Sequence, residues 1–288
     1  MNFKKLFKIG LILSLSMSVL VGCGEAAQDN ASQTEIVEVE PEEVVISVVG
    51  STTVTPVIEQ IAEAYKELNP NVKIEVQGVG SSAGIKAAIE GAADIGMASR
   101  ELKKGEKAVG LTETPIAQDA IAIVIHPTNP VKGLTTEQAK QIFEGKITNW
   151  SEIGGADAPI TVVTREDGSG TRGAFEKIMG LVDEDGVSTI SPVALVSEGN
   201  GAIKASVASK DNSIGFISLG TLDGTIKALE IDGVLPTVET TLAGDYKVAR
   251  NLLVLTPVTI SSDVQSFIDY ALSPEGQIIV SEHYIPVN

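Results

Sequence analysis

The sequence is poor in the side chains that carry covalent and metal chemistry. Its 288 residues include one cysteine, Cys23, and two histidines, His126 and His283. A single cysteine excludes an intramolecular disulfide, and no group of His, Cys, Asp and Glu has the spacing of a metal site. Ser169 lacks the G-x-S-x-G context of a hydrolase nucleophile, because Asp167 occupies the first glycine position, and no G-x-x-x-x-G-K-[ST] loop occurs. We therefore expect neither an enzyme nor a bound cofactor.

Basic residues are also scarce. Lys and Arg number 21 against 38 Asp and Glu, which gives a formal net charge of −17. The first 22 residues contain three lysines and no acid, so the remainder has 18 basic residues and a net charge of −20. This charge disfavours binding to nucleic acid. A bound anion would have to be held by local dipoles and a few arginines against the field of the whole molecule.

Residues 1–22 are predicted to be a lipoprotein signal peptide. Three lysines precede an apolar stretch, residues 9–21, that is too short for an ordinary membrane span. The segment ends in L-V-G-C, which resembles a bacterial lipobox and implies cleavage before Cys23 and acylation of its thiol. Two or three acyl chains would anchor the protein stably in the cell membrane. The alternative is a plain secretory signal with an incidental cysteine.

Residues 23–43 are predicted to be an acidic tether. From residue 24 to residue 43 there are seven acids, no base and no aromatic residue. Such a segment cannot bury enough apolar surface to order itself, and its like charges extend it. We expect it to connect the folded part to the membrane surface.

Short apolar runs alternate with helical patterns over the rest of the chain. This alternation predicts an α/β fold with buried strands. The predicted strands include residues 44–49, 72–76, 94–99, 116–125, 160–163 and 214–219.

The stretch T-R-E-D-G-S-G-T-R-G-A-F, residues 164–175, is the strongest candidate site. It connects a predicted strand to a helical pattern, so Ser169, Gly170 and Thr171 fall at a helix N-terminus. Unpaired N–H groups and the helix dipole favour a small anion there. Arg165 can supply a planar fork of donors to two oxygens of a tetrahedral oxyanion. The alternative is a capped helix with solvated arginines.

Other predicted strands also end in loops rich in hydroxyls. One is G-S-T-T-V-T-P, residues 50–56, and another is G-V-G-S-S-A-G, residues 78–84. The second resembles a dinucleotide fingerprint, but its spacing is one residue too long and its strand is not the first of the domain. In α/β sheets, ligands collect at the carboxyl ends of strands. We therefore expect these loops to converge.

In this order the motifs resemble the phosphate-binding proteins of bacterial phosphate ABC transporters. Further matching pieces are D-I-G-M-A-S-R-E, W-S-E-I-G-G, R-E-D-G-S-G-T-R and G-F-I-S-L-G. The resemblance implies a type II periplasmic-binding-protein fold, in which two α/β lobes joined by a hinge close on phosphate. We expect one lobe over residues 44–125 plus 221–288 and the other over 126–220. It also implies a monomer that delivers phosphate to membrane permease and ATPase subunits.

The resemblance further implies which residues contact phosphate. These are Thr52, Thr53, Ser81, Arg165, Ser169, Gly170 and Thr171.

One position departs from the family pattern. Better-known members have an aspartate after the serine that corresponds to Ser99, whereas this chain has Arg100. A buried carboxylate accepts a hydrogen bond from protonated phosphate and repels unprotonated sulfate. Asp119, polar within an apolar run, is our candidate for that role, since a buried aspartate needs a partner. The alternative for Asp119 is a structural carboxylate paired with Arg100 or Arg165. A direct contact of Arg100 with the ligand is a further alternative.

Three alternatives stay open. The same fold could hold sulfate, molybdate or a phosphonate, because a fold does not fix its ligand. A phosphate-handling enzyme would need catalytic groups that the sequence lacks. A sensor or adhesin could bind phosphate without delivering it.

Overall fold

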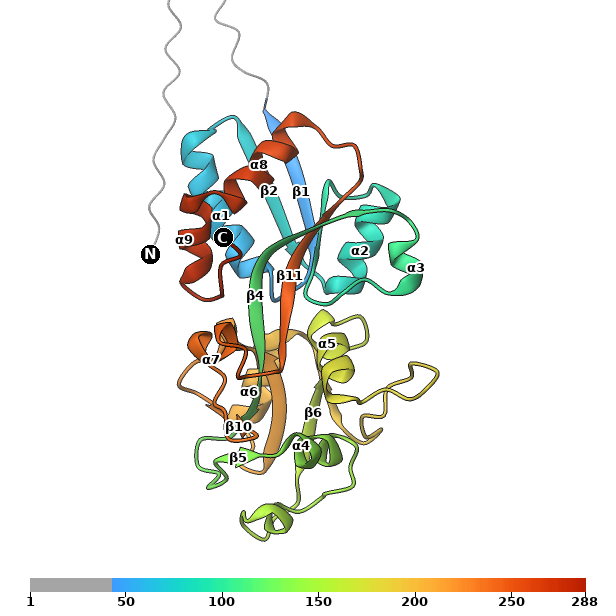
Figure 1. Cartoon of the computed structure of the whole chain (residues 1–288), viewed down its shortest axis with the longest axis vertical. Helices are drawn as coiled ribbons and strands as arrows, with labels where there is room; N and C mark the ends of the chain where they lie inside the picture. The colour runs from blue at the N-terminus through green and yellow to red at the C-terminus, as the bar shows by residue number, and fades with distance from the viewer. Residues whose placement is uncertain (1–42) are drawn as a thin grey trace, which may run out of the picture. The chain divides into compact units, whose positions relative to one another are not determined.

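The computed structural model describes residues 43–288, and in this range strands and helices alternate as the apolar runs predict. We divide the elements into a first lobe and a second lobe, and two long strands, β4 (Thr112–Ile125) and β11 (Ala249–Thr256), serve both (Figure 1). The first lobe contains β1 (Val44–Gly50), α1 (Thr55–Leu68), β2 (Val72–Gly78), α2 (Ser81–Glu90), β3 (Ile95–Ala98), α3 (Lys104–Lys107), α8 (Ser262–Leu272) and α9 (Pro274–Ser281). The second lobe contains β5 (Gly133–Leu134), α4 (Thr136–Phe143), η1 (Trp150–Ile153), β6 (Thr161–Arg165), α5 (Gly170–Met179), β7 (Leu195–Ser197), α6 (Gly199–Ala208), β8 (Ser213–Ser218), η2 (Leu219–Thr221), β9 (Lys227–Ala228), β10 (Glu230–Ile231) and α7 (Val238–Leu242).

One nine-stranded sheet runs through both lobes. Its order is β2-β1-β3-β11-β4-β8-β6-β7, with β9 paired to β4, while β5 and β10 form a separate pair. Within each lobe the strands that carry the predicted loops are parallel: β1 pairs with β2 and β3, and β6 pairs with β7 and β8. The carboxyl ends of these strands therefore open at one edge of each lobe. The predicted α/β fold with two lobes is confirmed.

Helices cover both faces of each half of the sheet. In the first lobe α1, α8 and α9 pack on one face around Ile46 and Phe267, and α2 packs on the other around Ile85. In the second lobe Phe175 stacks on Phe216 with ring centroids 4.1 Å apart, and α6 buries Ile203 on the opposite face. Neither face of the central strands is exposed to solvent, which explains why their sequences are continuously apolar.

The change from one core to the other occurs within β4 and β11. Along β4, Ala117 packs in the first core and Ala120 in the second. Val248, just before β11, packs in the second core, and Leu252 within β11 packs in the first. These positions differ from the boundaries predicted at residues 125/126 and 220/221. The reason is that the break at His126-Pro127 ends the strand, whereas the strand itself continues through both lobes. We place the lobe division in the middle of β4 and β11.

The predicted signal peptide, Cys23 and nearly all of the predicted tether lie outside the described residues. Among the helices of residues 43–288, none is long and apolar enough to cross a membrane.

Candidate functional site

Four helices from the two lobes begin close together. The turn before α1 places Thr53 so that its hydroxyl oxygen lies 3.1 Å from that of Thr171 in the first turn of α5. Asn200, in the first turn of α6, donates from Nδ2 to the Thr53 hydroxyl at 3.0 Å. The sequence argument that these turns converge is correct. We call the resulting cluster the cage; its members are Thr52, Thr53, Ser81, Ser99, Arg165, Gly170, Thr171 and Asn200.

The first lobe contributes a linked row of buried hydroxyls. Ser51 donates to the Ser99 hydroxyl at 2.8 Å, and the Ser81 hydroxyl lies 3.3 Å from Ser99. The backbone N–H of Ser99 donates to Ser81 at 3.0 Å. All three side chains are at most 2% exposed. These hydroxyls are held in place by each other, so they are oriented before any ligand arrives.

Glycine allows the two lobes to approach at the start of α5. Ser169 caps this helix, and its hydroxyl accepts from the backbone N–H of Arg172 at 3.2 Å. A Cβ on Gly170 would collide with the Ser81 hydroxyl and would lie 2.6 Å from that of Ser99. The N–H groups of Gly170 and Thr171 belong to the first turn of α5, which has no partners for them within the helix. The positive end of α5 therefore faces the hydroxyls of the other lobe.

Arg165 ends β6 and lies in the cage with only 1% of its surface exposed. Its Nε and Nη2 donate to the two carboxylate oxygens of Glu166 at 2.8 and 2.7 Å. Nη2 also donates to the Thr52 hydroxyl at 3.2 Å, and Nη1 donates to the Asn200 side-chain oxygen at 3.3 Å. Burial raises the pKa of Glu166, but the bonds from Arg165 outweigh burial and hold that pKa below its ordinary value. Arg165 is thus a fixed cation.

Asn200 and Ser99 belong to the cage but were not among the site residues predicted from the sequence. α6 begins at Gly199, after Glu198, which places Asn200 in the first turn of the helix. Asn200 is 5% exposed and bonds to both lobes. Its glycine neighbours, in G-N-G, were the available signal for a helix start with a polar side chain.

Asp119 does not pair with Arg100 or Arg165. Its partner is Arg250, which faces it across the antiparallel pair β4–β11 and donates from Nη2 to Oδ2 at 3.0 Å. The same Nη2 lies 3.4 Å from the Thr53 hydroxyl, so the pair sits directly beside the cage. Burial raises the pKa of the Asp119 carboxyl, and Arg250 opposes that rise.

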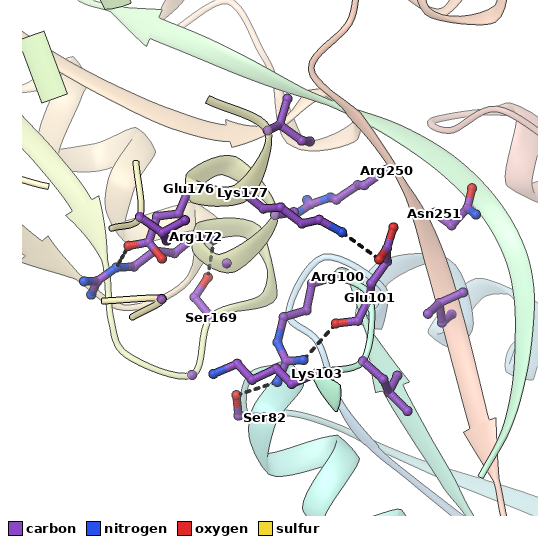
Figure 2. Close-up of a pocket in the computed structure, with 18 of the residues that line it drawn as sticks. Ser82, Arg100, Glu101, Lys103, Ser169, Arg172, Glu176, Lys177, Arg250 and Asn251 are labelled. Atoms are coloured by element: carbon purple, nitrogen blue, oxygen red, sulfur yellow. Dashed lines mark hydrogen bonds and ion pairs between the residues drawn. The ribbon is translucent and has the colours of Figure 1, made fainter. Parts of the chain in front are cut away.

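Arg100 lies outside the cage, on a neighbouring cavity of about 690 Å³ between the lobes (Figure 2). Its Nη1 and Nη2 donate to the two oxygens of Glu106 at 2.8 and 2.9 Å, and Nη2 also donates to Ser82 at 3.0 Å. The bond from Arg100 lowers the pKa of Glu106. Both terminal nitrogens of Arg100 are therefore bonded to a carboxylate or a hydroxyl of the first lobe.

The cage combines hydroxyls, helix amides and one fully buried guanidinium, with carboxylates behind the cations. This donor set matches a small tetrahedral oxyanion. Within residues 43–288 no group of three or more His, Cys, Asp or Glu could hold a metal ion.

Comparison with known proteins places the chain in a family. The model of the PBP superfamily domain matches residues 25–275. The phosphate-binding protein PstS of Bacillus subtilis (strain 168) is 30% identical over 96% of this chain and 92% of its own length. A crystal structure of a putative phosphate ABC transporter substrate-binding protein with bound phosphate, from Clostridium perfringens, is 48% identical with a TM-score of 0.82. It covers 85% of this chain and 100% of that one.

An ABC-type phosphate transport receptor from Vibrio cholerae is 38% identical with a TM-score of 0.73, over 84% of this chain and 99% of the other. These relatives cover the cage and both lobes. The chain belongs to the PstS phosphate-binding proteins of the PBP superfamily.

Proposed function

We propose that this chain captures inorganic phosphate between its two lobes and delivers it to the membrane permease of an ABC transporter. The observation that carries the proposal is the cage itself, in which donors from two lobes and four helix N-termini meet around Arg165. Relatives named as phosphate-binding proteins support the same ligand.

The contacts to phosphate are assigned residue by residue. The Arg165 fork faces two oxygens, and the helix N–H groups at Gly170 and Thr171 face a third. About nine such bonds at ~1.5–3 kcal/mol each, less ~4–15 kcal/mol for lost translational and rotational freedom, leave room for micromolar affinity or tighter. The remaining contacts come from the hydroxyls of Thr52, Thr53, Ser81, Ser169 and Thr171.

Asp119 is proposed as the carboxylate that discriminates between oxyanions. Its Oδ1 is buried and has no hydrogen-bond partner within residues 43–288. A carboxylate beside the cage accepts a proton-bearing phosphate and repels sulfate, which carries no proton at neutral pH. Arg100 is not assigned a contact, because its guanidinium bonds only to residues of its own lobe, whereas Arg165 also bonds to Thr52 of the opposite lobe.

Anchoring and partners complete the proposal. The lipobox supports a lipidated Cys23 that keeps the protein on the outer face of the cell membrane, with residues 24–43 as its tether. Monomeric docking on permease and ATPase subunits follows from the transporter role. Binding without catalysis is proposed because relatives are named for binding and transport.

Calorimetry with the purified chain tests the proposal. Inorganic phosphate should bind with one site per chain, and sulfate at comparable concentration should not displace it at acidic or mildly basic pH. Displacement by sulfate would reassign the cage to another oxyanion. Release of free phosphate from a phosphoester would instead favour an enzyme.

A further inference from the structure

Arg250 carries donors that its known partners leave unused. Its Nη2 is shared between Asp119 and Thr53. Its Nε and Nη1 are buried and have no hydrogen-bond partner within residues 43–288. The side chain is 4% exposed, so water outside the protein does not reach these atoms.

A purely structural pair would not have this form. β4 and β11 are already held by a ladder of backbone pairs from Ala249 to Thr256, so their register does not need the ion pair. Buried cationic donors without acceptors are costly. The arrangement makes physical sense where a further acceptor with negative charge meets Nε or Nη1.

The position of Arg250 beside the cage identifies that acceptor. Arg250 reaches the Thr53 hydroxyl, and Arg165 reaches the neighbouring Thr52 hydroxyl. The two guanidinium groups therefore approach one threonine pair, one from β6 and the other from the strand shared by both lobes. The chain contains four arginines, and within residues 43–288 these are the two whose guanidinium groups bond to hydroxyls of the cage.

We infer that Arg250 is a second guanidinium of the binding site and donates to an oxygen of the bound oxyanion while Asp119 positions it. This inference rests on the proposed function. Each cage arginine has its own carboxylate, Glu166 for Arg165 and Asp119 for Arg250. The protein frame is therefore close to neutral, which favours a ligand of low charge such as protonated phosphate over a fully ionised one.

The test compares variants that remove the arginine with and without its carboxylate. Asp119→Asn is the reference, since Arg250→Gln alone would leave a buried carboxylate unpaired. The double variant Arg250→Gln with Asp119→Asn removes both charges and leaves neutral polar side chains at both positions. In calorimetry with inorganic phosphate on the full chain, we expect the double variant to bind at least about 30-fold more weakly than Asp119→Asn. Equal affinity of the two would overturn the inference.

Two further variants keep the result interpretable. Arg250→Lys keeps the charge without the fork and should weaken phosphate binding about tenfold; unchanged affinity would count against the inference. The matched control is Arg100→Gln with Glu106→Gln, an ion pair outside the cage in which Arg100 is buried and Glu106 is partly exposed. Its phosphate affinity should stay within about threefold of that of the unmodified chain. If the unmodified chain binds no phosphate, the proposed function fails. If the unmodified chain binds phosphate and the substitutions at Arg250 do not weaken that binding, the inference alone fails.

Discussion

The cage and the neighbouring cavity both lie between the lobes and are both lined by arginines. They differ in the hydrogen-bond partners of those arginines. In the cavity, Arg100 is tied to Glu106, and Arg172 is tied to Asp167 and Glu176 at 2.7 Å each. The bridge between the lobes there, Lys177 to Glu101, is exposed on both sides. In the cage, Arg165 is also tied to Glu166, but it bonds in addition to Thr52 of the other lobe. Arg250, beside the cage, reaches Thr53 and keeps buried donors without a partner within residues 43–288.

The comparison shows that an anion site is not set by the number of cations. In the cavity, carboxylates satisfy the donors of Arg100 and Arg172. Arg250, which lines the cavity and also reaches Thr53 of the cage, keeps buried donors without a partner within residues 43–288. The cage has hydrogen-bond donors whose directions are fixed by the protein, and what these donors lack is an anionic acceptor. This is how a protein with a net charge of −17 can hold an anion.

The largest effect is expected from Arg165. Arg165→Ala should weaken phosphate binding by about 2–5 kcal/mol, or ~30- to ~3,000-fold in Kd, because it removes a desolvated cation that contacts the ligand. Calorimetry gives the affinity, and circular dichroism checks that the variant is folded. Unchanged binding by a folded variant would remove Arg165 from the site and make the cage no different from the cavity.

Closure of the lobes around the cage is the next target. Gly170→Ala places a methyl group against Ser81 and Ser99, so the lobes cannot meet, and overpacking of ~1–3 kcal/mol corresponds to a loss of up to about 100-fold in affinity. The matched control is Gly201→Ala, since a Cβ there meets nothing within 4 Å. Equal phosphate affinities for the two variants would show that the lobes do not need this contact.

Asp119 tests the origin of selectivity. Asp119→Asn should weaken phosphate binding modestly, about tenfold or less, and allow sulfate to compete.

Because burial raises the pKa of Asp119, the folded state keeps its proton at a pH where the unfolded chain has lost it. Stability should therefore fall as pH rises from the ordinary aspartate range through the raised pKa, and this fall should vanish in Asp119→Asn. Thermal melts of the unmodified chain and of Asp119→Asn across this pH range measure the fall. The same dependence of stability on pH in both proteins would contradict a raised pKa of Asp119.

The smallest effect on binding is expected in the cavity. Arg100→Gln should change phosphate affinity less than about threefold, because Arg100 makes no contact in the cage. Its effect should appear in stability. The bond from Arg100 lowers the pKa of Glu106, so the pair stabilises the fold above the ordinary glutamate pKa and loses that contribution as pH falls through the lowered value. The variant should show a shallower acid-side loss, and a large loss of affinity instead would place Arg100 in the site.

The sequence predicted the loops because their chemistry is local. Hydroxyls and glycines at strand ends indicate helix N-termini whatever the rest of the chain does, so Thr53, Ser81 and Thr171 were found together. Arg250 and the strand β11 were not assigned, since an arginine inside the apolar run of residues 249–256 has no local signature of a site. Its role depends on pairing with a residue 131 positions away.

The same limit explains Arg100 and the lobe boundaries. Next to Ser99, Arg100 was a reasonable ligand contact by position, but Glu106, six residues further along the chain in α3, accepts hydrogen bonds from both of its terminal nitrogens. The boundaries depended on where cores meet along β4 and β11. Both are properties of tertiary packing, which overrides local pattern.

A crystal structure of the chain grown with inorganic phosphate is the most direct test of the difference between cage and cavity. The account predicts one tetrahedral anion enclosed within hydrogen-bond distance of Arg165, Arg250 and the Thr171 amide, with none bound beside Arg172 and Lys177. An anion found in the cavity, with the cage hydroxyls bonded only to one another, would contradict it.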